Sequence, residues 1–142
     1  MIFKAVLLFL SASGICLASN AQEGTLQESM KRGEQVYTTY CASCHQPTGE
    51  GVEAAFPPLA KTSYLKNQKR AIVIVLTGQE GEITVNGKKY NAAMAPLNHL
   101  SDKEVADVLN YVSNSWGNKN PMIKEAQVKA ERKEDAKPPR SL

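Results

Sequence analysis

Apolar side chains recur at helical spacing near the start of the central part of the chain. Residues 29–44 fit one face of an α-helix, with Ser29 placed as a possible N-cap. Gly33 lies inside this helix, where glycine costs about 1 kcal/mol relative to alanine. It is either a tolerated glycine or the point where another helix backbone approaches closely. The apolar positions of the face are Met30, Val36, Tyr37, Tyr40 and Cys44.

A second helix is predicted from Ser101 to about Trp116. Ser101 and Glu104 have the spacing of a capping box, in which each residue satisfies a backbone N–H beside the other. Leu100 and Val105 are placed to form a hydrophobic staple around it, and Gly117 ends the pattern. One face of the helix carries Val105, Val108, Leu109, Val112 and Trp116.

Between these helices the pattern is broken by turns. Residues 45–62 contain enough glycine and proline to predict a loop. Residues 69–77 form a short apolar run whose periodicity fits helix or strand, although its β-branched content favours a strand. Residues 82–91 predict a β-hairpin, because Asn86-Gly87 is the dipeptide that suits a type I′ turn.

The two ends of the chain differ in composition from its centre. Residues 1–21 have the basic start, apolar run and small residues before Ala21 that are typical of a secretory signal peptide cleaved after Ala21. A lipid anchor on Cys16 is the weaker alternative, since Ile15 stands where a small residue is required. Residues 22–28 are predicted to be a loose lead-in. Residues 118–142 form a charged tail, with a partial helix around Ile123 to Ala130 and a disordered end.

Composition narrows the functional classes. The 142 residues suffice for one domain, and export would leave 16 basic and 14 acidic side chains. This small net charge gives no reason to expect binding to nucleic acid or strong attraction to a membrane surface. Export would also remove Cys16, so that only Cys41 and Cys44 remain in an oxidising compartment.

The stretch Cys41-Ala42-Ser43-Cys44-His45 allows several chemistries. Structural zinc usually requires four protein ligands, and the chain offers only this pair with His45 and His99. A redox dithiol would normally follow a strand, and a disulfide across two residues would be strained. The C-x-x-C-H string is instead typical of covalent haem attachment. Its spacing puts both thiols on one side of a helical turn and the imidazole next to the iron.

A haem held in this way needs a second axial ligand or has an open site. Met30 lies on a helix face expected to pack inward, and Met122 lies in the charged tail. Met94, in the turn-rich stretch YNAAMAPL, can reach the opposite face of the haem from a loop. His99 is a further candidate. An unligated methionine would simply fill space in the core.

These features together resemble a class I cytochrome c over roughly residues 29–117. The resemblance rests on CASCH, on GEGVEAAFPPLA after it, on the methionine loop and on VLNYVSNSWG. The hairpin and the segment after the loop are also similar to bacterial periplasmic cytochrome domains associated with copper nitrite reductases. The family implies an all-α fold, in which N- and C-terminal helices cross over a haem, with a small β-hairpin before the methionine loop.

The resemblance assigns roles to single residues. His45 would be the proximal ligand and Met94 the distal one, and the carbonyl of Pro57 or, preferably, Pro58 would accept the second N–H of His45. It also implies that residues 69–77 are helical and that Gly33 packs near Tyr111. In this sequence Ala95 separates Met94 from Pro96, whereas many relatives have proline directly after the methionine.

The function implied is periplasmic electron transfer by one covalent haem c, without enzymatic activity. The alternatives are a haem subunit of a larger oxidoreductase and, if Met94 does not ligate, a haem enzyme or gas-binding protein. Partners would be periplasmic reductases, oxidases or dehydrogenases, with neither nucleic acid nor stable membrane insertion. Partner proteins could dock on the basic tail or on a basic patch. If partners do not dock there, the patch is simply a solvated basic face. The patch residues are Lys66, Lys69, Arg70, Lys88 and Lys89.

Overall fold

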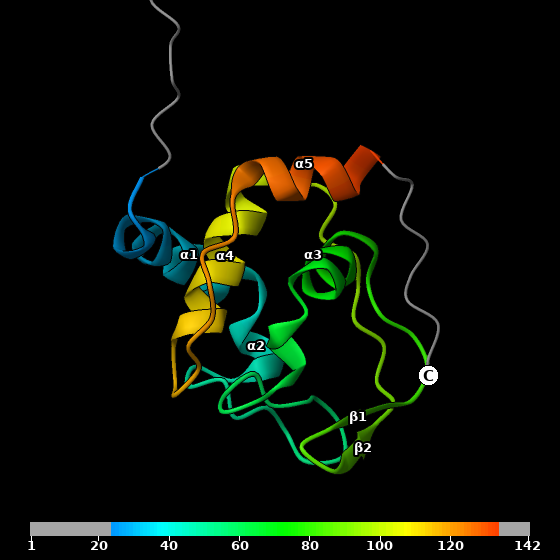
Figure 1. Ribbon diagram of the computed structural model, residues 1–142. Helices are drawn as coiled ribbons and strands as arrows, with labels where there is room; N and C mark the ends of the chain where they lie inside the picture. The colour runs from blue at the N-terminus through cyan, green and yellow to red at the C-terminus, as the bar shows by residue number, and fades with distance from the viewer. Residues whose placement is uncertain (1–23, 134–142) are drawn as a thin grey trace, which may run out of the picture.

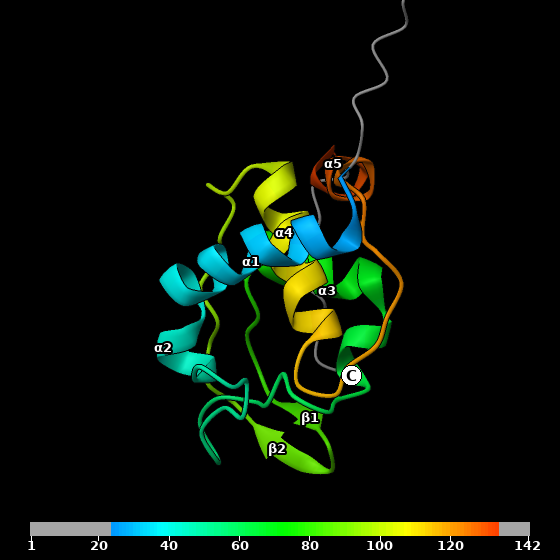
Figure 2. The same ribbon diagram turned by 90° about the vertical axis from the view of Figure 1, so that its left-hand side faces the viewer.

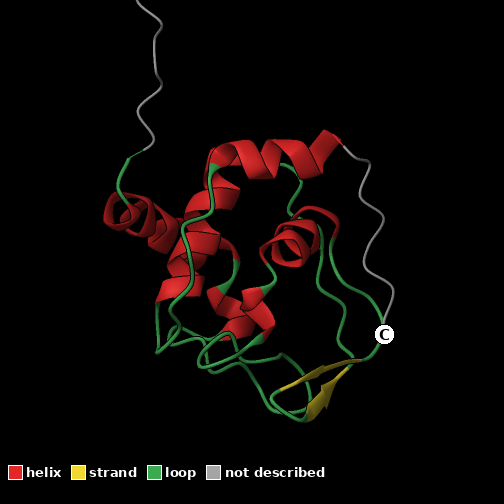
Figure 3. Cartoon of the chain, viewed as in Figure 1, coloured by secondary structure: helices red, strands yellow, loops and turns green. Residues whose placement is uncertain are grey.

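The computed structural model describes residues 24–133, in which the helices pack together and a small hairpin lies at one edge (Figures 1 and 3). The predicted signal peptide and the end of the predicted tail lie outside the described residues. The elements in chain order are α1 Leu26–Tyr40, α2 Ala42–His45, the 3-10 helix η1 Tyr64–Lys66, α3 Gln68–Thr77, β1 Ile83–Val85, β2 Lys88–Tyr90, α4 Asp102–Asn114 and α5 Glu125–Lys133.

Helix α1 begins earlier than the sequence pattern suggested. Thr25 is its N-cap and forms a capping box with Glu28. Residues 26–28 of the predicted lead-in therefore belong to the helix, and Ser29 is not its N-cap. Ser29 is instead 1% exposed and lies on the buried face with Gly33 and Tyr37. Each of these residues follows the previous one by about one helical turn. Tyr40 is 43% exposed, which corrects its expected place on the buried face.

Gly33 marks the place where α1 crosses α4 (Figure 2). A Cβ atom built at Gly33 would lie 1.9 Å from the carbonyl oxygen of Asp107 and 2.9 Å from Cβ of Tyr111. No side chain fits in that space, so glycine is required for the two backbones to approach. The predicted close crossing near Tyr111 is confirmed.

Buried polar groups fix this crossing. The carboxylate of Asp107 on α4 accepts hydrogen bonds from Ser29 Oγ at 2.6 Å and from Arg32 Nε at 2.6 Å and Nη2 at 2.8 Å. Asn110 donates to Ser29 Oγ at 2.9 Å and to the carbonyl of Ile123 at 2.9 Å, and its own oxygen accepts from the Ile123 N–H at 2.7 Å. The network therefore joins α1, α4 and the segment before α5.

Helix α4 keeps its predicted start and ends earlier than predicted. Ser101 and Glu104 form the expected capping box. The helix ends at Asn114, because Asn118 donates to the carbonyl of Val112 at 2.8 Å and Asn120 donates to that of Ser113 at 2.9 Å. Trp116 therefore leaves the helix and packs against Tyr37, with ring centroids 5.0 Å apart.

The middle of the chain forms the two predicted elements. Residues 69–77 lie within α3, whose N-cap Asn67 accepts a hydrogen bond from the Arg70 N–H. Strands β1 and β2 pair antiparallel, with Val85 opposite Lys88. Asn86 and Gly87 between them both have positive φ, 50° and 79°, as a type I′ turn requires. The helical assignment of α3 and the hairpin are confirmed.

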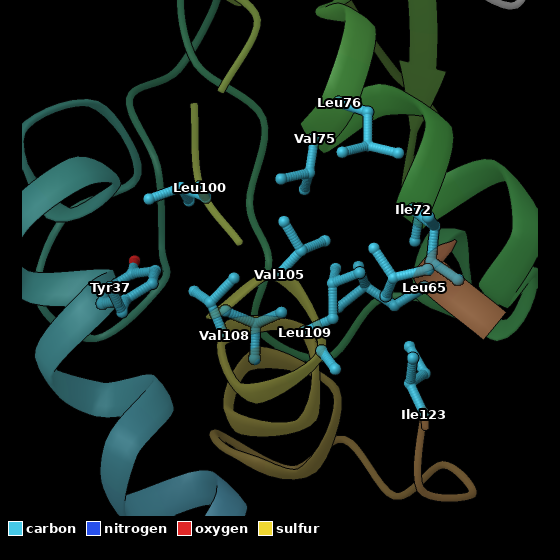
Figure 4. Packing of buried hydrophobic residues seen from close by; sticks show 14 residues of the cluster. Tyr37, Leu65, Ile72, Val75, Leu76, Leu100, Val105, Val108, Leu109 and Ile123 are labelled. Carbon is cyan, nitrogen blue, oxygen red and sulfur yellow. The ribbon is translucent and has the colours of Figure 1, made fainter. Parts of the chain in front are cut away.

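The hydrophobic core lies between α3 and α4 and extends beneath α5 (Figure 4). Helix α5 lies across α3 and α4 in Figure 1 and buries Val128 completely, while Ile123 before it is 1% exposed. The hydrophobic core thus includes residues after Gly117, the position at which the predicted domain ends and the charged tail begins. The remaining core side chains include Leu65, Ile72, Val75, Leu76, Leu100, Val105, Val108, Leu109 and Val112.

Candidate functional site

The CASCH stretch forms the short turn between α1 and the long loop. Cys41 ends α1, and Ala42–His45 make the single turn of α2. The His45 N–H donates to the Cys41 carbonyl at 2.9 Å, which keeps the two thiols and the imidazole within one helical turn. Cys41 and Cys44 are both free thiols and are partly buried. Burial, together with the charge of Cys44, raises the pKa of Cys41 to about 11.

Both cysteines and His45 line a predominantly apolar cavity of about 320 Å³. Its walls come from the loop after α2, from α3, from the hairpin and its flanking segments, and from the core face of α4. Met94 lines the same cavity from a loop. The apolar part of the lining includes Phe56, Pro57, Pro58, Leu59, Leu65, Ile74, Val75, Ile83, Val85, Leu97, Val108, Leu109 and Val112.

The loop after α2 orients the imidazole of His45. Its Nδ1 lies 2.9 Å from the carbonyl oxygen of Pro57, not of Pro58 as the resemblance suggested, while Pro58 only lines the cavity. A carbonyl can only accept, so Nδ1 carries the proton and Nε2 keeps a free lone pair. Burial lowers the pKa of His45, and the bond to Pro57 opposes this shift. The side chain is thus held as a neutral imidazole.

Gly51 allows the Pro57 carbonyl to reach His45. It has φ of 67°, and a Cβ atom there would lie 2.3 Å from the carbonyl oxygen of Phe56 and 2.8 Å from the carbonyl carbon of Pro57. Its N–H donates to the His45 carbonyl at 3.0 Å. The loop therefore folds back on itself so tightly that only glycine fits, and this fold places Pro57 beside the ring.

Met94 is held against the end of α3. Its N–H donates to the Gln79 carbonyl at 2.9 Å, and its carbonyl accepts from the Gln79 N–H at 3.0 Å. Gly78, with φ of 79°, leaves no room for a Cβ atom, which would lie 2.5 Å from the Met94 carbonyl oxygen. Of the four candidate second ligands, only Met94 lines the cavity. His99 instead makes an edge-to-face contact with Tyr40, with ring centroids 5.4 Å apart.

No Asp, Glu, Lys or Arg side chain among the described residues lines the cavity. Tyr40, Ala92, Ala93 and Ala95 line the cavity and are exposed, and we call them the uncharged rim. The basic residues proposed as a patch are largely engaged elsewhere: Lys88 pairs with Glu53 at 2.6 Å, Lys89 with Glu82 at 2.8 Å and Lys69 with Glu131 at 3.3 Å. Arg70 packs over the ring of Tyr64, 3.9 Å from its centroid.

Sequence reasoning missed the residue that ties the histidine loop to α4. Asn118 donates to the Leu59 carbonyl at 2.6 Å and accepts from the Thr62 N–H at 3.2 Å, while also binding the end of α4. It holds the segment after Pro57 in place. Its only signal was its position directly after Gly117, where an amide can satisfy free helix carbonyls.

Two thiols, a neutral imidazole and a thioether therefore share one apolar cavity between the crossed helices and the hairpin. Residues 30–116 match the family described as Cytochrome c. The chain belongs to the cytochrome c family. This membership confirms the class I cytochrome c fold, covalently bound haem c as the cofactor and electron transfer as the functional class.

The relatives include proteins named cytochrome c-552 and cytochrome c subunits of dehydrogenases. A cytochrome c-552 of Thermus thermophilus is 37% identical over 99 residues, covering 66% of each chain, and a second c-552 of that species is 39% identical, covering 60% of this chain and 68% of the relative. The cytochrome c subunit of the quinone alcohol dehydrogenase of Gluconobacter oxydans is 35% identical, over 63% of this chain. The match covers 19% of that subunit and about two thirds of each c-552.

The residues present fit a haem group. The cavity is predominantly apolar, as the porphyrin requires, and its lining includes two thiols, an imidazole and a thioether. Soft sulfur and nitrogen donors suit haem iron, and the bond from His45 to Pro57 is the hydrogen bond that a ligating histidine typically makes with its other ring nitrogen. Among residues 24–133 no helix has the length and apolarity needed to cross a membrane.

Proposed function

We propose that this chain is a single-haem electron carrier in which Cys41 and Cys44 attach the haem and His45 and Met94 occupy both axial positions. The observation that carries the proposal is that these four side chains, and no other candidate ligand of the described chain, line one cavity. With both axial positions filled, no vacancy is left for a substrate. The protein then acts as a carrier rather than an enzyme.

Each residue has a defined task in this proposal. Haem supplies a reversible one-electron couple. Cys41 and Cys44 would hold it through thioether bonds to its vinyl groups, and His45 would present the free lone pair of Nε2 to the iron because Pro57 accepts its other N–H. The thioether of Met94 would favour the reduced iron and thereby raise the reduction potential. The apolar walls exclude water, so little reorganises when the electron moves.

Partners would be redox proteins of an exported compartment, and contact would occur over the uncharged rim. This placement rests on the signal-like residues 1–21 and on the exposed alanines beside Met94. A haem subunit of a larger oxidoreductase is the second candidate, supported by relatives that are dehydrogenase cytochrome c subunits. Copurification of a tagged chain from its own host with a dehydrogenase or reductase would favour this second candidate. The finer similarity to nitrite reductase cytochrome domains stays a prediction.

Covalent attachment is tested by acid–acetone extraction. We expect the haem to stay with the wild-type polypeptide, and to be lost when Cys41 and Cys44 are both replaced by serine. A wild-type haem that extracts freely would show that attachment through CASCH is wrong.

The second axial ligand is tested by Met94→Ala with Met122→Ala as the matched control. Met94→Ala should admit carbon monoxide to the reduced iron and lower the potential, since a thioether that stabilises ferrous iron is lost. Met122 does not line the cavity, so its replacement should change neither property. Retention of the wild-type low-spin spectrum by Met94→Ala would exclude Met94 as a ligand.

A further inference from the structure

Helix α5 reaches the loop that carries Met94. It lies outside residues 30–116, the part of the chain that matches the family. At its end, Arg132 Nη1 donates to the Asn98 carbonyl at 2.9 Å and Nη2 donates to the Leu100 carbonyl at 2.7 Å. Its Nε donates to Asp102 Oδ1 at 2.6 Å. One guanidinium thus joins the end of the methionine loop to the first turn of α4.

The rest of the loop has only a few anchors. Met94 pairs with Gln79, and the Leu97 N–H donates to the Val75 carbonyl at 2.8 Å, so both anchors lie on α3 or directly after it. Leu100 is 3% exposed and packs into the core below α5. Arg132 supplies the side-chain donors on the other side, toward α4. Without it, the carbonyls of Asn98 and Leu100 would lose these charge-assisted bonds.

We infer that Arg132 is a positioning residue for the Met94 ligand, acting by fastening the loop 94–100 from α5. This inference rests on the proposed ligation of iron by Met94. A planar guanidinium places donors on three nitrogens in a fixed fork and so reaches two carbonyls and a carboxylate at once, whereas an ammonium group has its three donors on a single nitrogen. The side chain of Arg132 is 32% exposed. Water can therefore replace part of the hydrogen bonding that is lost when Arg132 is substituted.

The test is the rate of carbon monoxide binding to the reduced holoprotein at neutral pH and room temperature. Carbon monoxide can bind only while Met94 is off the iron, so the rate reports opening of the loop. We expect Arg132→Ala to raise this rate about tenfold, which corresponds to about 1.4 kcal/mol in the opening equilibrium. Arg132→Lys keeps the charge without the fork and should give an intermediate rate, and it remains informative if the alanine variant does not fold.

Glu131→Gln is the matched control. It alters the neighbouring residue and removes the ion pair of Glu131 with Lys69, which joins α5 to α3 and does not touch the methionine loop. We expect its carbon monoxide rate to equal that of the wild type even if its melting temperature falls. The inference is overturned if Arg132→Ala stays within twofold of the wild type, or if Glu131→Gln raises the rate equally.

Failure of this inference can be told apart from failure of the proposed function. If the wild-type protein itself binds carbon monoxide as fast as Met94→Ala, then Met94 is not a ligand and both proposals fail. If the wild type is closed, Met94→Ala is open and Arg132→Ala is closed, then Met94 ligates and only the role of Arg132 is wrong.

Discussion

Replacing Gly33 by alanine should destabilise the protein, although alanine is the better helix former. The added Cβ atom would lie 1.9 Å from the Asp107 carbonyl oxygen, and side-chain carbons essentially never come closer than 3.0 Å to such atoms. The obstacle is backbone and cannot rotate away. Helices α1 and α4 must therefore move apart by about 1 Å at their closest point.

The magnitude follows from two opposing terms. Overpacking of this kind costs about 1–3 kcal/mol, and a backbone clash at a helix crossing belongs at the upper end. Helix propensity returns about 1 kcal/mol. We therefore expect a net loss of about 2 kcal/mol in the free energy of unfolding, or a fall in melting temperature of roughly 8–12 °C for a domain of this size. Gly33→Val should cost more, because its branched side chain adds to the clash.

The assay is thermal unfolding of the holoprotein followed by circular dichroism. Gln35→Ala is the matched control, since Gln35 is exposed on the same helix and its replacement should change the stability by less than about 0.5 kcal/mol. A Gly33→Ala protein that melts at or above the wild-type temperature would refute the close crossing.

Three further predictions concern charge, the histidine loop and docking. Burial would raise the pKa of Asp107, but its bonds from Arg32, Ser29 and Lys103 lower that pKa below its ordinary value. Asp107→Asn should thus lower the free energy of unfolding, measured in urea at neutral pH, by about 1–3 kcal/mol. The difference in stability between the wild type and this variant should narrow below about pH 4, where Asp107 becomes protonated. A difference that widens in acid would contradict this. Gly51→Ala should displace the Pro57 carbonyl from His45 and change the reduction potential, and an unchanged potential would argue against that contact. Electron transfer of the wild type with its physiological partner should depend weakly on ionic strength, because Lys88 and Lys89 pair with glutamates. A steep fall in rate with salt that Lys88/Lys89→Glu abolishes would restore the basic patch.

Local signals with a clear physical cause were readable in the sequence. The capping box at Ser101 and the Asn86-Gly87 turn act within a few residues, so their spacing alone predicts structure. Thr25 and Glu28 have the same capping-box spacing, which the sequence also shows. The apolar pattern of α1 is weak, however, and it is equally consistent with a helix that begins at Ser29. The buried face of α1 consists of Ser29, Gly33 and Tyr37, and a hydrophobic pattern cannot identify a serine and a glycine as core residues.

Features that depend on long-range contacts were out of reach. The choice between the Pro57 and Pro58 carbonyls is decided by how tightly the loop folds at Gly51, a property of tertiary packing. The bonds of Arg132 span 30 to 34 residues in sequence, and a lone arginine in a charged segment gives no sign of them. By contrast, the CASCH string concentrates its chemistry in five residues, so it predicts covalent haem attachment without any long-range contact.

The central claim is that one haem is held with both axial positions filled by side chains of this protein. Addition of carbon monoxide to the reduced wild-type holoprotein at neutral pH tests it most directly. We predict an unchanged visible spectrum on mixing, because His45 and Met94 leave the iron no vacancy. Rapid and stoichiometric formation of a carbon monoxide complex would contradict the account and would indicate an open site suited to ligand binding or catalysis.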